Sequence, residues 1–359
     1  MSKILPTWTW LVPVLALGFL IVALVVGAGT WLTSLCGVAL AAAVFVAVHH
    51  AEVVAHRVGE PFGTLVLALA VTAIESALIL SMMVAGGQDM AVLARDSIYA
   101  AVMIICTGVV GLCLLAGGLA HREQTFRVEG AGAGLAALIV MAVLTLVLPT
   151  FTTTTPGPTY SRLQLGFVAV SLALLWAIFI FVQTMRHRDY FIPVENSSDP
   201  EARAEPPTVR QAWASFGWLL LSLATVVGLA KVLSPTIEKT VDAAHAPRAV
   251  VGIVIAGLVL LPETWAAVRA ARANRLQTSM NLAIGSSLAT IGLTVPLVVV
   301  ASVVFNLPLV LGLPPKEMAL LSATFLVSAI TLGTGRTNLM QGAVHLVLFA
   351  AYLLLSFVP

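Results

Sequence analysis

Apolar stretches long enough to cross a lipid bilayer recur along this chain from residue 10 to residue 358. A hydrocarbon core about 30 Å thick needs about 20 apolar residues per helix, and on that basis the sequence predicts eleven membrane spans. They cover residues 10–27, 30–50, 62–85, 97–119, 131–149, 163–185, 213–233, 248–268, 279–304, 317–334 and 338–358. Only 9% of the residues are charged, where a soluble domain carries about a quarter. The pattern predicts an all-α polytopic membrane protein surrounded by lipid.

Lysine and arginine are divided unevenly between the two sides that these spans define. Positively charged loops stay in the cytoplasm, and with the N-terminus inside, twelve of the 18 basic residues fall on the cytoplasmic side. We therefore expect a multi-pass protein of a bacterial inner (plasma) membrane, with the N-terminus in the cytoplasm and the C-terminus outside. No stripe of basic residues alternates with aromatic ones, so nucleic acid is not expected as a partner.

The longest hydrophilic stretch separates the sixth span from the seventh. Residues 186–211 are rich in charge and proline, which is typical of a linker. The chain then divides into an N-terminal helix (1–29), a first half (30–185), the cytoplasmic linker (186–211) and a second half (212–359). Each half has five helices, and because five is odd, homologous halves must lie in opposite orientations. This predicts two inverted five-helix repeats, as in many secondary transporters.

Two acidic residues, Glu75 and Glu263, lie well inside strong spans. A lone carboxylate in hydrocarbon costs several kcal/mol, so it faces the bundle interior or a water-filled cavity, and a functional role is the first hypothesis. The alternative is a carboxyl group that only joins helices by hydrogen bonds. Glu75 lies about 18 Å and Glu263 about 17 Å into its helix at 1.5 Å per residue, and the two helices enter from opposite sides. We therefore expect the two carboxyl groups to face one another near the midplane.

Oxygen atoms close to both glutamates favour a cation site. Pro262 removes a backbone donor and frees a carbonyl one turn earlier. Hydroxyl groups that could add ligands, or could simply pack between helices, are those of Thr72, Ser76, Thr264, Ser286 and Ser287. Two carboxylates with such oxygens suit a hard cation, Ca²⁺ in the first place. Without the cation, two neighbouring carboxylates in a low dielectric favour protonation, so Glu75 and Glu263 would hold either the metal or protons.

A polar group of residues ends the second predicted span. His49, His50 and Glu52 could relay protons, because imidazole titrates near neutrality. The alternative is a polar cluster at the membrane interface. His345, in the last span, is expected to be a packing or hydrogen-bonded histidine.

Two blocks of sequence resemble the α-repeats of the Ca²⁺:cation antiporter superfamily, and in particular bacterial calcium/proton antiporters of the ChaA kind. The first block is GEPFGTLVLALAVTAIESALIL (59–80) with RDSIYAAVMIICTGVVG (95–111), and the second is LLPETWAAVRAARANRLQTSMNLAIGSSLATIGLTVP (260–296). The resemblance implies an eleven-helix fold with inverted repeats, in which one acidic residue per repeat binds cation and protons. These residues correspond to Glu75 and Glu263, and the GSS segment corresponds to Gly285, Ser286 and Ser287.

The sequence also departs from that family. Many members have Gly-Asn-x-x-Glu at the binding helix, whereas Val71 and Thr72 precede Glu75, and Val259 and Leu260 precede Glu263. A glutamine that often follows GSS is replaced by Ala289. The departures leave the choice among Ca²⁺, Na⁺ and K⁺ open.

Secondary active exchange of a cation for protons by alternating access is the function that these features predict. The protein is then not an enzyme; it needs no resident cofactor, and the ions are its cargo. One alternative is an intramembrane serine protease, because Gly285–Ala289 fits a loose GxSxA pattern with Ser287 as nucleophile and His345 as base. A cation channel is another alternative. The sequence is also compatible with a homo-oligomer.

Overall fold

The computed structural model describes residues 6–27, 29–59, 62–86, 90–192, 207–243, 247 and 249–358. Ten helical segments in these ranges are long and apolar enough to cross a membrane, and an eleventh apolar helical segment, Ala68–Val84, is shorter. The all-α prediction with eleven spans is confirmed. Residues 193–206 of the predicted linker lie outside the described ranges.

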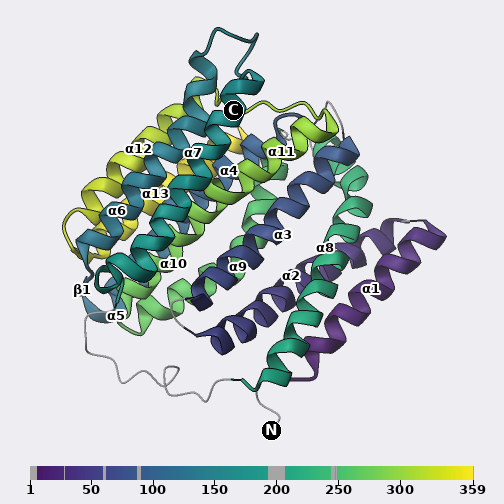
Figure 1. The fold of residues 1–359 in the computed structure, drawn as a ribbon, viewed down its shortest axis with the longest axis horizontal. Helices are drawn as coiled ribbons and strands as arrows, with labels where there is room; N and C mark the ends of the chain where they lie inside the picture. The colour runs from purple at the N-terminus through teal and green to yellow at the C-terminus, as the bar shows by residue number, and fades with distance from the viewer. Residues whose placement is uncertain are drawn as a thin grey trace. The chain divides into compact units, whose positions relative to one another are not determined.

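The chain forms two compact units that interleave in sequence. Unit 1 comprises residues 1–90 and 198–246, and unit 2 comprises residues 91–197 and 247–359. Figure 1 gives the helix labels used below.

Within the described residues, unit 1 contains four helices. They are α1 (Trp8–Val26), α2 (Thr30–Val58), α3 (Phe62–Gly86) and α8 (Val209–Ala243). The long helix α2 packs against the other three, and α8 also contacts α1 and α3. Glycines with positive φ, Gly27 and Gly59, follow α1 and α2, as is common at helix ends, where glycine adopts this conformation without strain.

Unit 2 is built around one nearly continuous helical span, Leu93–His121, which is the most buried span of the described residues. It consists of α4 (Leu93–Met103), the π-helical segment η2 (Ile104–Val109) and α5 (Val110–His121). A second composite span consists of α10 (Leu276–Ala289), η7 (Thr290–Thr294, also π-helical) and α11 (Val295–Phe305). Each is the third span of its half, and a π-helical turn interrupts both, as often occurs at functional positions.

The remaining elements of unit 2 surround these spans. They are α6 (Val128–Ala142), η3 (Val143–Val147), η4 (Leu148–Phe151), α7 (Arg162–Phe181), η5 (Val182–Arg186), η6 (Arg188–Tyr190), α9 (Ala249–Arg272), α12 (Pro315–Leu332) and α13 (Leu339–Phe357). Helices α9, α10 and α13 contact α5, and α9 also contacts α4. Two short strands, β1 (Glu123–Thr125) and β2 (Arg336–Asn338), pair antiparallel with Gln124 opposite Thr337. They hold together the turns that follow α5 and α12.

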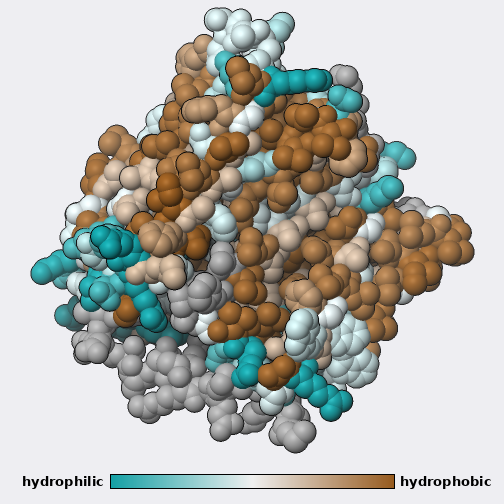
Figure 2. Space-filling view, in the orientation of Figure 1, coloured by the Kyte–Doolittle hydropathy of each residue, from teal (hydrophilic) through white to brown (hydrophobic). Residues whose placement is uncertain are grey.

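Large apolar side chains remain exposed along the helices, as a lipid-facing surface requires. Trp31 is 87% exposed, Leu163 is 85% exposed and Trp265 is 72% exposed. In Figure 2, hydrophobic residues cover the sides of the helices, and hydrophilic ones gather near β1. The exposed apolar sides agree with a chain that is solvated by lipid.

Candidate functional site

Glu263 lies in the middle of α9 and is only 8% exposed. Helix α9 continues through Pro262, whose ring nitrogen cannot donate to the carbonyl of Leu258 one turn earlier. The carboxyl group and the loosened backbone therefore lie close together on one helix. This is the arrangement that the sequence predicts for the second cation-binding residue.

Helix α10 brings Ser286 to this carboxyl group. A tight turn after α9 reverses the chain, with Arg275 N bonded to Ala270 O at 2.9 Å. Glu263 comes nine residues before the end of α9 and Ser286 comes ten residues after the start of α10, so the hairpin places them at equal depth. Ser286 Oγ donates to Glu263 Oε2 at 2.5 Å. The short contact joins a hydroxyl to a carboxylate inside the helical bundle of unit 2.

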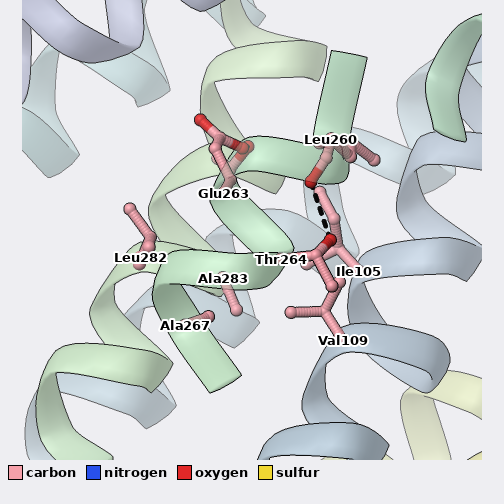
Figure 3. A pocket seen from close by; sticks show the side chains of 9 residues that line it. Ile105, Val109, Leu260, Glu263, Thr264, Ala267, Leu282 and Ala283 are labelled. Carbon is pink, nitrogen blue, oxygen red and sulfur yellow. Dashed lines mark hydrogen bonds between the residues drawn. The ribbon is translucent and has the colours of Figure 1, made fainter. Parts of the chain in front are cut away.

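A small pocket of about 10 Å³ adjoins the pair, near the lower limit of the space that one water molecule needs. Figure 3 shows Glu263 and Thr264 on different sides of α9, with Thr264 beside Ile105 and Val109. Thr264 Oγ1 donates to Leu260 O at 2.7 Å, so its lone pairs remain available to a cation. Three polar side chains thus border an otherwise apolar pocket lined also by Leu260, Ala267, Leu282 and Ala283.

Ser287 has different surroundings from Ser286. It is fully buried and lies beside the Cys106 thiol, outside hydrogen-bonding geometry. His345 Nδ1 contacts Cys106 O at 2.7 Å, and His345 Nε2 contacts Thr331 Oγ1 at 3.1 Å. Both imidazole nitrogens are therefore engaged with groups other than Ser287. The protease alternative is wrong, because a nucleophile and its base must share a hydrogen bond.

Glu75 lies on α3 in unit 1 and is 3% exposed. Thr72 and Ser76 are also buried, and Thr72, three positions before Glu75, can share its side of the helix. Apolar side chains, including Ile74 and Ile79, are fully buried on the same helix. A second buried carboxylate with two hydroxyl groups near it in sequence is thus present. The expected meeting of Glu75 with Glu263 stays a prediction.

The histidines that end the second predicted span lie inside α2, which continues to Val58. The prediction that this span stops at residue 50 is therefore wrong. His50 Nε2 contacts Thr9 O at 3.0 Å, and the His49 ring lies 5.2 Å from that of Trp8. These contacts join α2 to α1. A proton relay through His49, His50 and Glu52 stays a hypothesis.

The sequence pattern did not single out Asp96 and Glu317, because both lie near the ends of predicted spans. Asp96 is 5% exposed in the first turn of α4, and one oxygen of Glu317 is buried. The sequence gives only weak evidence for these two residues: each is an acidic residue directly after a basic one, Asp96 after Arg95 and Glu317 after Lys316.

Comparison with known proteins identifies relatives of nearly the whole chain. A family model described as sodium/calcium exchanger protein matches residues 26–185 and 214–358. The protein y4hA of Sinorhizobium fredii, a putative ionic transporter by its name, is 45% identical over 363 residues, which cover 100% of this chain and 98% of the relative. The sodium-potassium/proton antiporter ChaA of Escherichia coli is 36% identical over 315 residues, covering 87% of this chain and 85% of the relative.

The fold also resembles a solved structure. The crystal structure of an H⁺/Ca²⁺ exchanger, CAX, matches with a TM-score of 0.71 over 96% of this chain and 87% of that chain, at 17% identity. At that identity the likeness concerns the fold. It confirms the predicted architecture of inverted repeats.

Proposed function

This chain belongs to the sodium/calcium exchanger family, and we propose that it is a secondary active antiporter that exchanges a cation for protons by alternating access. Members of this family are transporters, so the protein is not an enzyme. The observation that carries the proposal is the buried Glu263 bonded to Ser286. A buried acidic group within a membrane span is costly unless it binds an ion or a proton.

Competition for the same oxygen atoms supplies the coupling. We propose that Glu75 and Glu263 bind either the cation or protons, with Ser286 and Thr264 as further oxygen ligands. A cation cannot bind a carboxylate oxygen that carries a proton, so each exchanged ion displaces the other. Each glutamate is buried on its own helix, Glu75 on α3 and Glu263 on α9, and a buried acidic residue of a membrane span is expected to have a functional role.

The transported cations are proposed on two grounds. Two carboxylates can neutralise a divalent ion, and oxygen ligands suit hard cations, so Ca²⁺ comes first. Na⁺ and K⁺ are added because the Escherichia coli relative is named a sodium-potassium/proton antiporter. We place the protein in a bacterial plasma membrane, with its N-terminus in the cytoplasm.

The test is transport by purified protein in liposomes that contain a pH-sensitive dye. Adding Ca²⁺, Na⁺ or K⁺ outside should move protons out of the lumen, in proportion to cation uptake. The flux should saturate with cation concentration, whereas a channel would conduct without proton movement. Lowering the pH should weaken apparent cation affinity, by up to about tenfold per pH unit for each competing proton.

Two variants test the site itself. Glu263→Gln and Glu75→Gln should each abolish exchange, because an amide keeps the shape but can neither titrate nor neutralise a cation. Replacing either glutamate by aspartate should lower the affinity for the cation more than it impairs the coupling to protons. The matched control is Glu129→Gln, an exposed glutamate in the first turn of α6, which should transport normally. Near wild-type exchange by either site variant would remove that glutamate from the mechanism.

A further inference from the structure

The π-helical segment η2 leaves one backbone carbonyl without its usual donor. In an α-helix each N–H donates to the carbonyl four residues earlier, so Val110 N would donate to Cys106 O. Val110 N donates instead to Ile105 O and Thr107 O. Cys106 is buried, so its carbonyl group has little access to water and needs a donor from another element.

His345 on α13 supplies that donor. Its side chain is fully buried, and its Nδ1 atom lies 2.7 Å from Cys106 O. A carbonyl oxygen can only accept, so Nδ1 must carry the hydrogen atom. In the neutral ring Nε2 then has no hydrogen and accepts from Thr331 Oγ1, which lies 3.1 Å away on α12. One neutral imidazole thus joins α13, η2 and α12 with both of its nitrogens satisfied.

Close packing keeps the imidazole in this position. A Cβ atom at Gly111 of α5 would lie 3.0 Å from Leu346 Cγ and 3.1 Å from His345 Cβ. One at Gly342 of α13 would lie 2.6 Å from Leu115 N. Gly342, His345 and Leu346 are spaced three and four positions apart, so they share one side of α13. This side lies directly on α5, and the ring has little room to move away from the carbonyl group of η2.

The segment that His345 holds is also a wall of the pocket beside Glu263. Ile105 and Val109 of η2 line this pocket together with Thr264 (Figure 3). A π-helical turn contains one more residue than an α-helical turn, so a return of η2 to α-helix would rotate the side chains after it relative to those before it. The shape of the pocket wall therefore depends on the conformation of η2.

We propose that His345 is a positioning residue for cation binding, which holds η2 in its π-helical form and so shapes the pocket beside Glu263. The neutral ring acts through its hydrogen bond to Cys106 O; it neither contacts the cation nor transfers a proton. Without the imidazole the buried carbonyl would lose its partner, and an α-helical turn would let it regain one from Val110 N. That a cation binds beside Glu263 rests on the proposed function.

Isothermal titration of the detergent-solubilised protein with Ca²⁺ tests this role without transport. His345→Leu removes the donor and should lower the affinity by about tenfold. His345→Asn should keep the affinity within about threefold of wild type, because its amide nitrogen can take the place of Nδ1 as donor. Wild-type affinity in His345→Leu overturns the proposal, and so does an equal loss in His345→Asn and His345→Leu.

A matched control removes the same kind of bond at an exposed position. His121 Nε2 contacts Arg272 O at 2.8 Å, but His121 is exposed, so water can replace the imidazole. His121→Leu should therefore keep its affinity within about twofold of wild type. If His345→Leu does not fold, His345→Gln takes its place, because the longer amide reaches the position of Nε2 beside Thr331 rather than that of Nδ1.

Nitrogen NMR of protein with isotopically labelled histidine identifies the bond itself. The resonances that are missing in His345→Asn belong to His345, and they should show a hydrogen on Nδ1 and none on Nε2. A hydrogen on Nε2 alone, or on both nitrogens, overturns the proposal.

Transport separates positioning from proton transfer. His345→Asn cannot titrate near neutrality, so its cation/proton exchange should keep the wild-type dependence on pH. A shifted pH profile would make His345 a proton carrier and overturn the proposal. If the wild type and the variants bind Ca²⁺ in the expected order but the wild type shows no proton-coupled flux, the proposed antiport is refuted and the positioning role stands.

Discussion

The Ser286 hydroxyl holds one oxygen of Glu263, and its neighbour Ser287 does not. Ser286→Ala should therefore lower cation affinity by about tenfold, since a hydrogen bond to a charged group contributes about 1.5 kcal/mol. Ser287→Ala is the matched control, because it removes the same hydroxyl one residue further along α10, and its affinity should stay within about twofold of wild type. Isothermal titration of the detergent-solubilised protein measures both. A larger loss in Ser287→Ala than in Ser286→Ala would contradict the contact described here.

Helix α9 lies so close to α4 at Gly252 that adding a single methyl group there should force the two helices apart. A Cβ atom at Gly252 would lie 2.7 Å from the backbone carbon of Asp96 and 2.8 Å from Ser97 N, and backbone atoms cannot move aside easily. Gly252→Ala should lower stability by about 1–3 kcal/mol, measured as thermal unfolding in detergent. Gly257→Ala, on the same helix with no atom within 4 Å of its Cβ position, should be neutral or stabilising. Equal stability of the two variants would rule out this close packing.

The predicted orientation of the whole chain in the membrane rests on its basic residues, and it can be tested at the two ends of the span formed by α7 and η5. Arg162 and Arg188 are exposed and flank this span. In a background where Cys36, Cys106 and Cys113 are replaced by alanine, an impermeant thiol reagent should label Arg162→Cys in intact cells and Arg188→Cys only in inside-out vesicles. The positive-inside rule places Arg188 in the cytoplasm. The opposite labelling pattern would invert the predicted orientation.

Much of the architecture could be predicted because the bilayer sets the length of apolar helix that crosses it. The eleven spans and the burial of Glu75 and Glu263 followed from that constraint and from the cost of a charge in lipid. The end of α2 did not follow, because His50 can continue a helix when Thr9 O of α1 offers it a partner. Such a partner comes from a different helix, so the residues around His50 in the sequence do not reveal it.

Which side chains meet depends on how the helices pack. One residue along a helix turns the side chain by about 100°, so the sequence could propose both Ser286 and Ser287 as ligands but could not choose between them. The hairpin of α9 and α10 directs Ser286 to Glu263, and Ser287 to the vicinity of Cys106. Asp96 and Glu317 come from distant parts of the sequence, near the ends of two spans. They interact electrostatically because helix packing brings the starts of α4 and α12 together, which the pattern of apolar residues along either helix cannot specify.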